Sequence, residues 1–141
     1  MEKSTEELMN ILKSKKTYEE FFEEEVGELC FSSVAEYLSL LITEKKLKKS
    51  DIIKRSNLDK NYAYQIFNGI KTCPSRDKII MLAFGMKLNL NETRKLLKIA
   101  QQKDLYVRDP RDSVIIFCIN KGYSLIEANE SLNDYGLEFL E

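Results

Sequence analysis

Residues 47–71 read LKKSDIIKRSNLDKNYAYQIFNGIK, and this stretch predicts two short helices, 49–56 and 60–68, joined by a tight turn. In the first helix we expect Ile52 and Ile53 to face inward. In the second, apolar side chains recur at i, i+3, i+4 and i+7, the spacing of one buried helix face. They are Ala63, Ile66, Phe67 and Ile70. This spacing leaves the opposite face of the second helix to solvent.

The solvent face of helix 60–68 is rich in amides rather than simply charged. It carries Lys60, Asn61, Tyr64, Gln65 and Asn68, and Lys71 follows just past Gly69. Asn and Gln each present a donor beside an acceptor, the arrangement that pairs with the major-groove edge of adenine, and Lys can reach guanine or phosphate. This face is therefore a candidate surface for reading DNA.

Helix starts can be located along the whole chain from their capping residues. A Ser, Thr or Asn accepts a hydrogen bond from a free backbone amide, and a Glu three residues later bonds back. Five such pairs are Ser4/Glu7, Thr17/Glu20, Ser33/Glu36, Asn89/Glu92 and Ser124/Glu127. The pattern predicts an all-α fold, with helices near 5–14, 18–29, 34–46, 49–56, 60–68, 76–86, 90–101, 111–121 and 125–135.

An internal repeat becomes visible when the sequence is shifted by 35 positions. The stretch SRDKIIMLAFGMKLNLNETRKLL at 75–97 then pairs with PRDSVIIFCINKGYSLIEANESL at 110–132. Identical residues include Arg76/Arg111, Asp77/Asp112, Ile80/Ile115, Leu90/Leu125, Glu92/Glu127 and Leu97/Leu132. We interpret the match as two copies of one helical hairpin; the alternative is that any two capped amphipathic hairpins look alike.

The residues that are absent exclude several classes of function. The chain of 141 residues has no His, which removes the usual general base and the commonest metal ligand. Cys30, Cys73 and Cys118 lack metal-binding spacing, and no glycine-rich phosphate loop is present. No apolar run approaches the ~20 residues of a membrane span. We therefore expect a cytoplasmic protein that is not an enzyme, has no cofactor or metal site, and does not contact a membrane.

Charge is distributed unevenly along the chain. Residues 1–32 contain nine acidic and four basic residues, 33–103 contain six acidic and fifteen basic, and 104–141 contain eight acidic and three basic. A segment of net charge +9 thus lies between two segments of net charge −5. We expect an acidic helical leader at 1–32, a DNA-binding domain at 33–103 and a C-terminal helical hairpin at 104–141.

The run QIFNGIKTCPSRDKIIMLAFGM, at 65–86, with the cap at Asp59 and the opening at Leu47, resembles the lambda-repressor-like helix-turn-helix domain of Cro/repressor-type (XRE family) regulators. The resemblance covers residues 33–100 and implies a five-helix core. It implies that helix 60–68 enters the major groove of double-stranded DNA.

The resemblance also implies roles for individual residues. Lys60, Asn61 and Gln65 occupy base-reading positions, with Tyr64 and Tyr62 beside them. We expect Tyr64 on the base-reading side and Tyr62 on the phosphate side, although both tyrosines could equally pack against neighbouring helices. The DNA backbone is expected to contact Lys49, Asn68 and Lys71.

The sequence departs from the family pattern at two positions. Family members usually have Ser, Thr or Asn as the cap where this chain has Lys48, and Lys cannot accept an amide hydrogen bond. Either Ser50 caps a shorter helix, or Lys48 exchanges stability for another phosphate contact. Asn57 stands where Gly is frequent, and Asn tolerates the left-handed conformation that such a turn needs.

These observations predict a sequence-specific, double-stranded-DNA-binding transcriptional regulator that acts as a homodimer on an inverted repeat. The alternative is a protein-interaction adaptor or antitoxin-like partner that binds another protein through the acidic leader or the C-terminal hairpin. Apolar residues of the hairpin would pack on the core, form the dimer, or do both. A further hypothesis is that the leader folds over the basic middle and competes with DNA.

Overall fold

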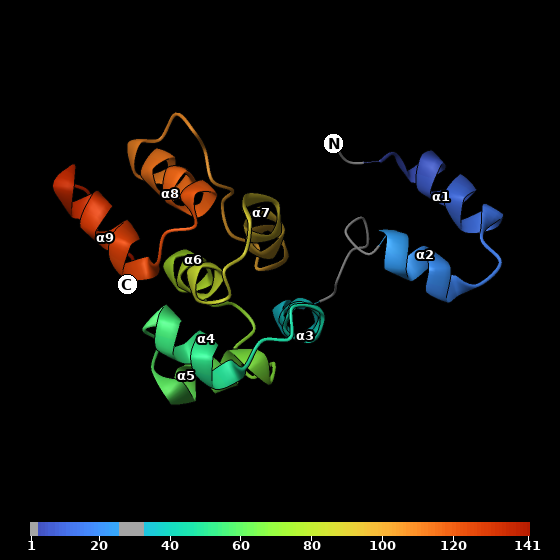
Figure 1. Ribbon diagram of the computed structural model, residues 1–141, viewed down its shortest axis with the longest axis horizontal. Helices are drawn as coiled ribbons and strands as arrows, with labels where there is room; N and C mark the ends of the chain where they lie inside the picture. The colour runs from blue at the N-terminus through green and yellow to red at the C-terminus, as the bar shows by residue number, and fades with distance from the viewer. Residues whose placement is uncertain (1–2, 26–32) are drawn as a thin grey trace. The chain divides into compact units, whose positions relative to one another are not determined.

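The structure is a computed structural model that describes residues 3–25 and 33–141, and these residues form α helices and no strand. The chain divides into two compact units, Met1–Cys30 and Phe31–Glu141. The helices, shown in Figure 1, are α1 (Thr5–Ser14), α2 (Tyr18–Glu25), α3 (Val34–Glu44), α4 (Lys49–Ser56), α5 (Lys60–Phe67), α6 (Arg76–Gly85), α7 (Leu90–Ile99), α8 (Pro110–Lys121) and α9 (Leu125–Asp134).

The prediction of an all-α fold is confirmed for the described residues, and so are the predicted helix starts. Side chains of Ser4, Thr17 and Ser33 accept hydrogen bonds from the amides of the Glu residues three positions on. Asn89 and Ser124 form complete capping boxes, in which Glu92 and Glu127 bond back to the cap amide. The end of the expected helix 18–29 and the thiol of Cys30 lie outside the described residues.

The first unit contains α1 and α2. The Lys3 ammonium donates to the Glu25 carboxylate at 2.5 Å, and Lys15 pairs with Glu24. Phe21 is buried, and its ring centre lies 5.8 Å from that of Tyr18, whereas Glu19 and Glu20 are exposed. Among the described helices, none combines the length and the apolar character needed to cross a bilayer.

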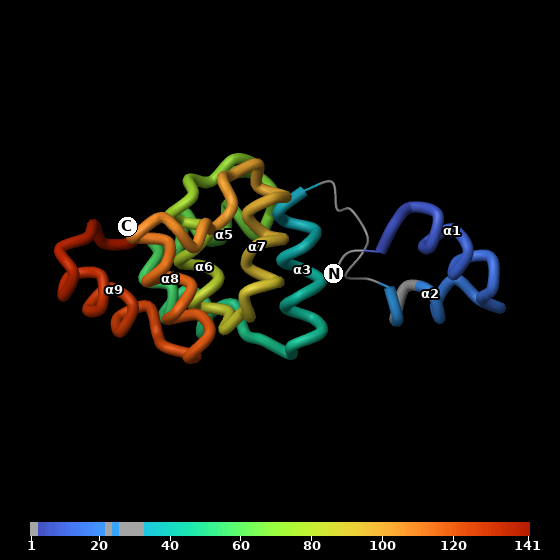
Figure 2. The backbone as a smooth tube through the Cα atoms, turned by 90° about the horizontal axis from the view of Figure 1, so that it is seen from above, coloured from blue at the N-terminus to red at the C-terminus, as the bar shows by residue number. Residues whose placement is uncertain are grey.

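The second unit is built around α6. Figure 1 shows α6 between α4 and α5 on one side and the later helices on the other, and Figure 2 shows it between α7 and α8. Every residue from Ile79 to Gly85 is buried, so this helix has no solvent face over its last two turns. It packs against α4, α7 and α9, while α3 contacts α5 and α7. The core that positions the candidate site is therefore continuous from α3 to the C-terminal hairpin.

The hairpins α6–α7 and α8–α9 repeat each other at the predicted offset of 35 residues. Besides their matching capping boxes, they contain left-handed residues at equivalent places: Lys87 matches Gly122 (φ 55° and 71°), and Gln101 matches Gly136 (φ 57° and 68°). The interpretation of the match as two copies of one structural unit is therefore confirmed. The shared backbone geometry extends past the aligned stretch, to the chain following each second helix.

The two hairpins are joined by reciprocal ion pairs. The Arg76 guanidinium donates to the Asp112 carboxylate at 2.8 and 3.0 Å, and the Arg111 guanidinium donates to Asp77 at 2.9 and 3.0 Å. Each carboxylate also accepts a backbone amide, of Tyr106 and of Glu141 respectively. Because residue i of one copy binds residue j of the other in both directions, the hairpins pair as the halves of a two-fold dimer do.

Each of these arginines also donates hydrogen bonds to the chain that follows its own hairpin. Arg76 donates to the carbonyl oxygens of Lys103 and Asp104, and Arg111 donates to those of Glu138 and Phe139. These acceptors are again 35 residues apart. The guanidinium groups therefore hold the end of each hairpin as well as its partner.

Candidate nucleic-acid interface

The turn between α4 and α5 is closed by local chemistry. Asn57 adopts the left-handed conformation (φ 53°, ψ 31°), which confirms the expectation that Asn would serve in place of Gly. Leu58 is buried beneath the turn. The Asp59 carboxylate then accepts the Tyr62 amide at 3.1 Å, which starts α5. The orientation of α5 relative to α4 is thus set by three consecutive residues.

Helix α4 begins at Lys49, so the alternative in which Ser50 caps a shorter helix is wrong. Lys48 occupies the cap position and makes no side-chain hydrogen bond there. The first amides of α4 consequently lack the side-chain acceptor that the other capped helices have. Free amides at a helix start carry partial positive charge and favour an anion.

The buried face of α5 follows the predicted pattern for three of its four residues. Ala63, Ile66 and Phe67 are buried, but Ile70 is 70% exposed. The prediction for Ile70 is wrong because α5 ends at Phe67 and Gly69 reverses the chain with φ 78°, so helical spacing no longer applies. In α4, Ile52 is fully buried and Ile53 is half-buried.

The opposite face of α5 carries the candidate base-reading residues. Lys60, Asn61 and Asn68 are exposed, and Gln65 is half-buried. Asn61, Gln65 and Asn68 stand at i, i+4 and i+7 and therefore lie on one stripe of the helix. The backbone carbonyl of Gln65 accepts the amides of both Ile70 and Lys71, at 2.9 and 3.0 Å, which holds Lys71 against the end of α5.

Both candidate tyrosines pack against the protein core. Tyr64 is half-buried, and its ring meets the Phe67 ring edge-on at 6.1 Å. The ammonium groups of Lys71 and Lys78 lie 6.0 and 5.9 Å from the centre of the Tyr62 ring. Tyr62 therefore links the start of α5 to the loop and to α6, with both cations near its ring. Lys78 was not among the predicted contact residues.

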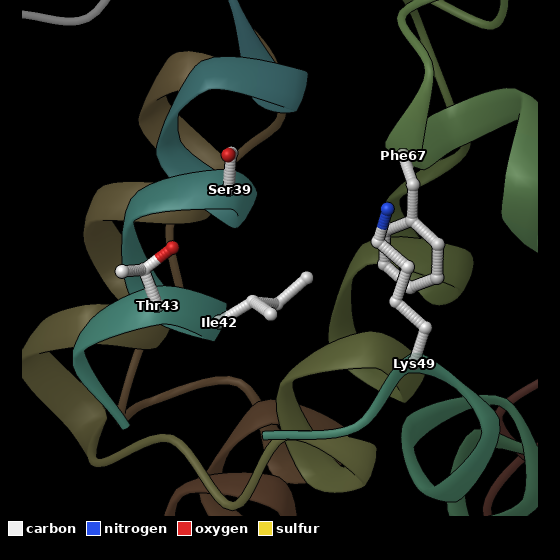
Figure 3. Close-up of a pocket in the computed structure, with 5 residues that line it drawn as sticks. All are labelled: Ser39, Ile42, Thr43, Lys49 and Phe67. Atoms are coloured by element: carbon white, nitrogen blue, oxygen red, sulfur yellow. The ribbon is translucent and has the colours of Figure 1, made fainter. Parts of the chain in front are cut away.

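A second cation lies at the other end of α5. The Lys49 ammonium is 5.7 Å from the centre of the Phe67 ring, and Figure 3 shows it beside that ring. The two residues form one wall of a small cleft of about 210 Å³, and Ser39, Ile42 and Thr43 of α3 form the other. The hydroxyl groups of Ser39 and Thr43 were missed by sequence reasoning, although their i, i+4 spacing on the exposed face of α3 is a signal that could have found them.

The cations around α5 differ from others of the segment 33–103 in their partners. Lys45 pairs with Glu92, Arg76 with Asp112 and Arg94 with Asp104.

Within the described part of the chain, Lys49, Lys60 and Lys71 form no ion pair. Their charge is not neutralised by a neighbouring carboxylate. It is therefore available to an external anion at both ends of α5.

The structure thus collects the predicted residues on α5 and beside it. Helix α5 carries Lys60, Asn61, Tyr62, Tyr64 and Gln65, and Asn68 is its C-cap residue. The Lys71 ammonium lies near the Tyr62 ring, and the Lys49 ammonium lies near the Phe67 ring. Comparison of the chain with protein-family models, with curated proteins and with solved structures found no match.

Proposed function

We propose that the protein is a sequence-specific, double-stranded-DNA-binding transcriptional regulator of the Cro/repressor type. In this proposal α3–α7 form the helix-turn-helix core and α5 is the recognition helix. The observation that carries the proposal is the division of α5 into two faces. One face is wholly buried at Ala63 and Ile66, and the other presents amides and a lysine to solvent.

Docking on the DNA backbone comes first in the proposed mechanism. Lys49 and Lys71 bind phosphates at the two ends of α5, and Asn68 donates a hydrogen bond to a phosphate between them. The uncapped start of α4 adds free amides beside Lys49, and Tyr62 holds Lys71 and Lys78 in place. These contacts position the protein without reading sequence.

Base reading follows from the solvent face of α5. Asn61 and Gln65 each present a donor and an acceptor suited to adenine, and Lys60 can donate to guanine. Tyr64 lies beside them and contributes an apolar edge. Because one such helix reads few base pairs, a homodimer on an inverted repeat in the cytoplasm is part of the proposal.

The decisive experiment selects bound fragments from random duplex DNA, using the wild-type chain and the variants Asn61→Ala and Gln65→Ala. If these side chains read bases, each variant relaxes the preference at one position of the half-site and loses about 1–3 kcal/mol of discrimination there. Asn120→Ala, an exposed amide on α8, is the matched control and leaves the selected sequence unchanged. Uniform weakening without loss of preference would assign both residues to backbone contacts instead.

The phosphate contacts are tested separately through salt. Lys71→Ala lowers affinity for all sequences alike and makes the log-log dependence on salt shallower by about 0.9, since one phosphate fewer is neutralised. Affinity for random duplex is measured at several salt concentrations. An unchanged slope of log affinity against log salt concentration would show that Lys71 does not contact phosphate.

The adaptor hypothesis remains the second candidate, because exposed aromatic side chains gather on the C-terminal hairpin. Phe117, Tyr135 and Phe139 are each at least half exposed. Binding to random duplex at low salt discriminates the two functions. An absence of salt-dependent association would favour the adaptor and contradict DNA binding.

A further inference from the structure

A groove runs between α8 and α9 in the C-terminal hairpin. Its volume is about 630 Å³, and its walls include Val114, Phe117, Tyr123, Tyr135 and Leu137. The Phe117 and Tyr123 rings meet edge-on at 6.1 Å, so this wall is ordered by a ring contact. Phe117 is 52% exposed and Tyr135 is 75% exposed. Large aromatic side chains thus remain open to solvent in a concave surface.

The first hairpin shows the same groove in a covered state. At the offset of 35 residues, Ile79, Leu82 and Ala100 of α6–α7 correspond to Val114, Phe117 and Tyr135. The three residues of the first copy are buried, with exposed fractions of 0%, 0% and 4%. Within the same chain, α4 packs on α6 of that hairpin and α3 packs on α7, and this packing covers them. The second copy has the apolar groove but, among the described residues, no helix that covers it.

The helix that packs on α6 of the first hairpin, α4, indicates what kind of element would fit the groove of the second hairpin. Helix α4 packs directly on α6 and inserts Ile52 into the core. Its polar side is net basic, with the cations Lys49, Lys54 and Arg55 against one acid, Asp51. Arg55 donates to the Gly85 carbonyl oxygen at 2.8 Å, so a basic side chain of the covering helix hydrogen-bonds to the end of α6. An amphipathic helix with a basic polar face is therefore the natural occupant.

The segment that carries the second groove is net acidic, although the Lys121 ammonium lies 5.6 Å from the centre of the Phe117 ring at the groove wall. Asp134 lines the groove itself. In the segment 104–141, Asp104 and Asp112 are neutralised by arginines, and Arg111 is held by Asp77. The remaining charges of this segment are Asp109, Glu127, Glu130, Asp134, Glu138 and Glu141 against Arg108 and Lys121. A basic helix would gain attraction here, and an acidic one would be repelled.

The same charges disfavour a second copy of this chain as the occupant. A two-fold dimer through the groove would place one net-acidic hairpin against another, and like charges brought close together cost free energy. A head-to-tail contact with the basic segment 33–103 of another copy would build a ring or a filament instead of a two-fold dimer.

We propose that the α8–α9 groove binds one amphipathic helix with a basic polar face, supplied by a different protein. Phe117 and Tyr135 are the apolar anchors, and Asp134 pairs with a cation of the bound helix. The polar end of Asn120 stands where the first copy has Gly85, so the helix lies farther from α8 than α4 lies from α6. This site is separate from α5, and its failure would not affect the DNA-binding proposal.

The test measures binding of a fluorescent 18-residue peptide of Leu and Lys, with Leu at helical i, i+3, i+4 and i+7 positions, to the full chain by anisotropy. We expect saturable one-to-one binding that Phe117→Ser with Tyr135→Ser weakens at least about tenfold. Asp134→Lys also weakens it. Ile126→Ser is the matched control, because Ile126 is 71% exposed on α9 but does not line the groove.

Three results would overturn the proposal. One is equal binding of the peptide to the double variant and the wild type, which would show attachment elsewhere on the chain. Another is equal or tighter binding of the matching peptide of Leu and Glu. The third is a homodimer, measured by light scattering, that Phe117→Ser with Tyr135→Ser separates into monomers. Circular dichroism checks that each variant remains folded, and both substituted aromatic residues are exposed enough for this comparison.

Discussion

At the scale of single residues, Gly85 shows how little space separates α4 from α6. A Cβ atom at this position would lie 1.9 Å from the Ser56 Oγ atom and 2.8 Å from the Ile52 carbonyl oxygen. Ser56 is itself buried and donates to that carbonyl at 2.6 Å. The glycine is therefore required by close helix packing rather than by backbone conformation.

Gly85→Ala should destabilise the fold, although alanine is the better helix former. The gain in helix propensity is about 1 kcal/mol, whereas overpacking costs about 3 kcal/mol. We expect the free energy of unfolding, measured by urea denaturation, to fall by about 2 kcal/mol.

The reason for this cost can be checked with a second substitution. Ser56→Ala removes the nearest atom, so the double variant recovers part of the loss, while the contact with the Ile52 carbonyl persists. A Gly85→Ala protein as stable as the wild type would contradict the close approach of α4 to α6.

At the scale of elements, α4 and the reciprocal ion pairs have the clearest consequences. Within the described residues, α4 differs from the other helices in that the side chain of its N-cap residue, Lys48, makes no capping hydrogen bond, and Lys49, Ser50 and Asp51 of its first turn are exposed. The hairpins, in contrast, are joined by two arginine–carboxylate pairs whose side chains are only 4–23% exposed. We therefore expect substitutions at the α4 cap to raise stability and substitutions in the ion pairs to lower it.

Lys48→Ser should stabilise the protein, because serine can accept the free amide of the first turn. The expected gain is about 1 kcal/mol in the free energy of unfolding. If Lys48 also contacts phosphate, the same variant binds random duplex more weakly. Lys46→Ser, an exposed control outside the cap position, should leave the stability of α4 unchanged. A loss of stability in Lys48→Ser would show that lysine makes another favourable contact there.

The Asp77–Arg111 pair predicts a contribution to stability that depends on pH. Burial disfavours the charged Asp77 carboxylate, but hydrogen bonds from Arg111 and the Glu141 amide more than offset this and lower its pKa below the ordinary value of 3.8. A carboxylate with a lowered folded-state pKa stabilises the fold above the unfolded-state pKa, and this contribution is lost as pH falls through the folded-state pKa.

Asp77→Asn should accordingly lower the free energy of unfolding at pH 7 by about 1–3 kcal/mol. The difference from the wild type should shrink below about pH 4. Urea denaturation at several pH values measures both effects. Asp51→Asn serves as the control, because Asp51 is exposed and joins no ion pair in the described part of the chain. A constant difference between pH 7 and pH 3 would contradict the role of the charge.

At the scale of the whole molecule, the C-terminal hairpin is part of the second unit's core. Residues Phe31–Glu141 cluster as one compact unit, in which α9 contacts α6 and α8 contacts α7. Leu132 and Leu140 are buried along with Ile115. The segment expected as a separate hairpin at 104–141 thus contributes buried residues to the same core as 33–103.

Ending the chain at Lys103 should therefore destabilise what remains. The truncation uncovers parts of α6 and α7 and removes Asp112, the partner of Arg76. We expect a loss of more than about 3 kcal/mol, since each buried aliphatic side chain contributes about 1.5–3 kcal/mol. Thermal unfolding followed by circular dichroism measures the change. An unchanged melting temperature would instead support an independent domain at 33–103.

The candidate site could be predicted in part. The solvent positions of Lys60, Asn61 and Asn68 follow from helical spacing within α5, and the structure places them there. Ile70 was predicted wrongly because the spacing rule holds only inside a helix, and Gly69 turns the chain away. Tyr64 and Phe67 are i, i+3 neighbours on α5, so helical spacing can place their rings together. The position of Tyr62 beside Lys78 depends on how α6 packs, which periodicity within one helix cannot supply.

Local sequence is enough to predict where helices begin and that one hairpin recurs after 35 residues. Capping bonds span three residues, and a left-handed turn involves one, so nearby side chains are sufficient to specify them. The pairing of Arg76 with Asp112, the contact of α4 with Gly85 and the exposure of Phe117 where Leu82 is covered depend instead on the tertiary structure. The Arg76–Asp112 and Arg55–Gly85 bonds join residues 36 and 30 positions apart in the sequence, and these residues meet only when the core has packed.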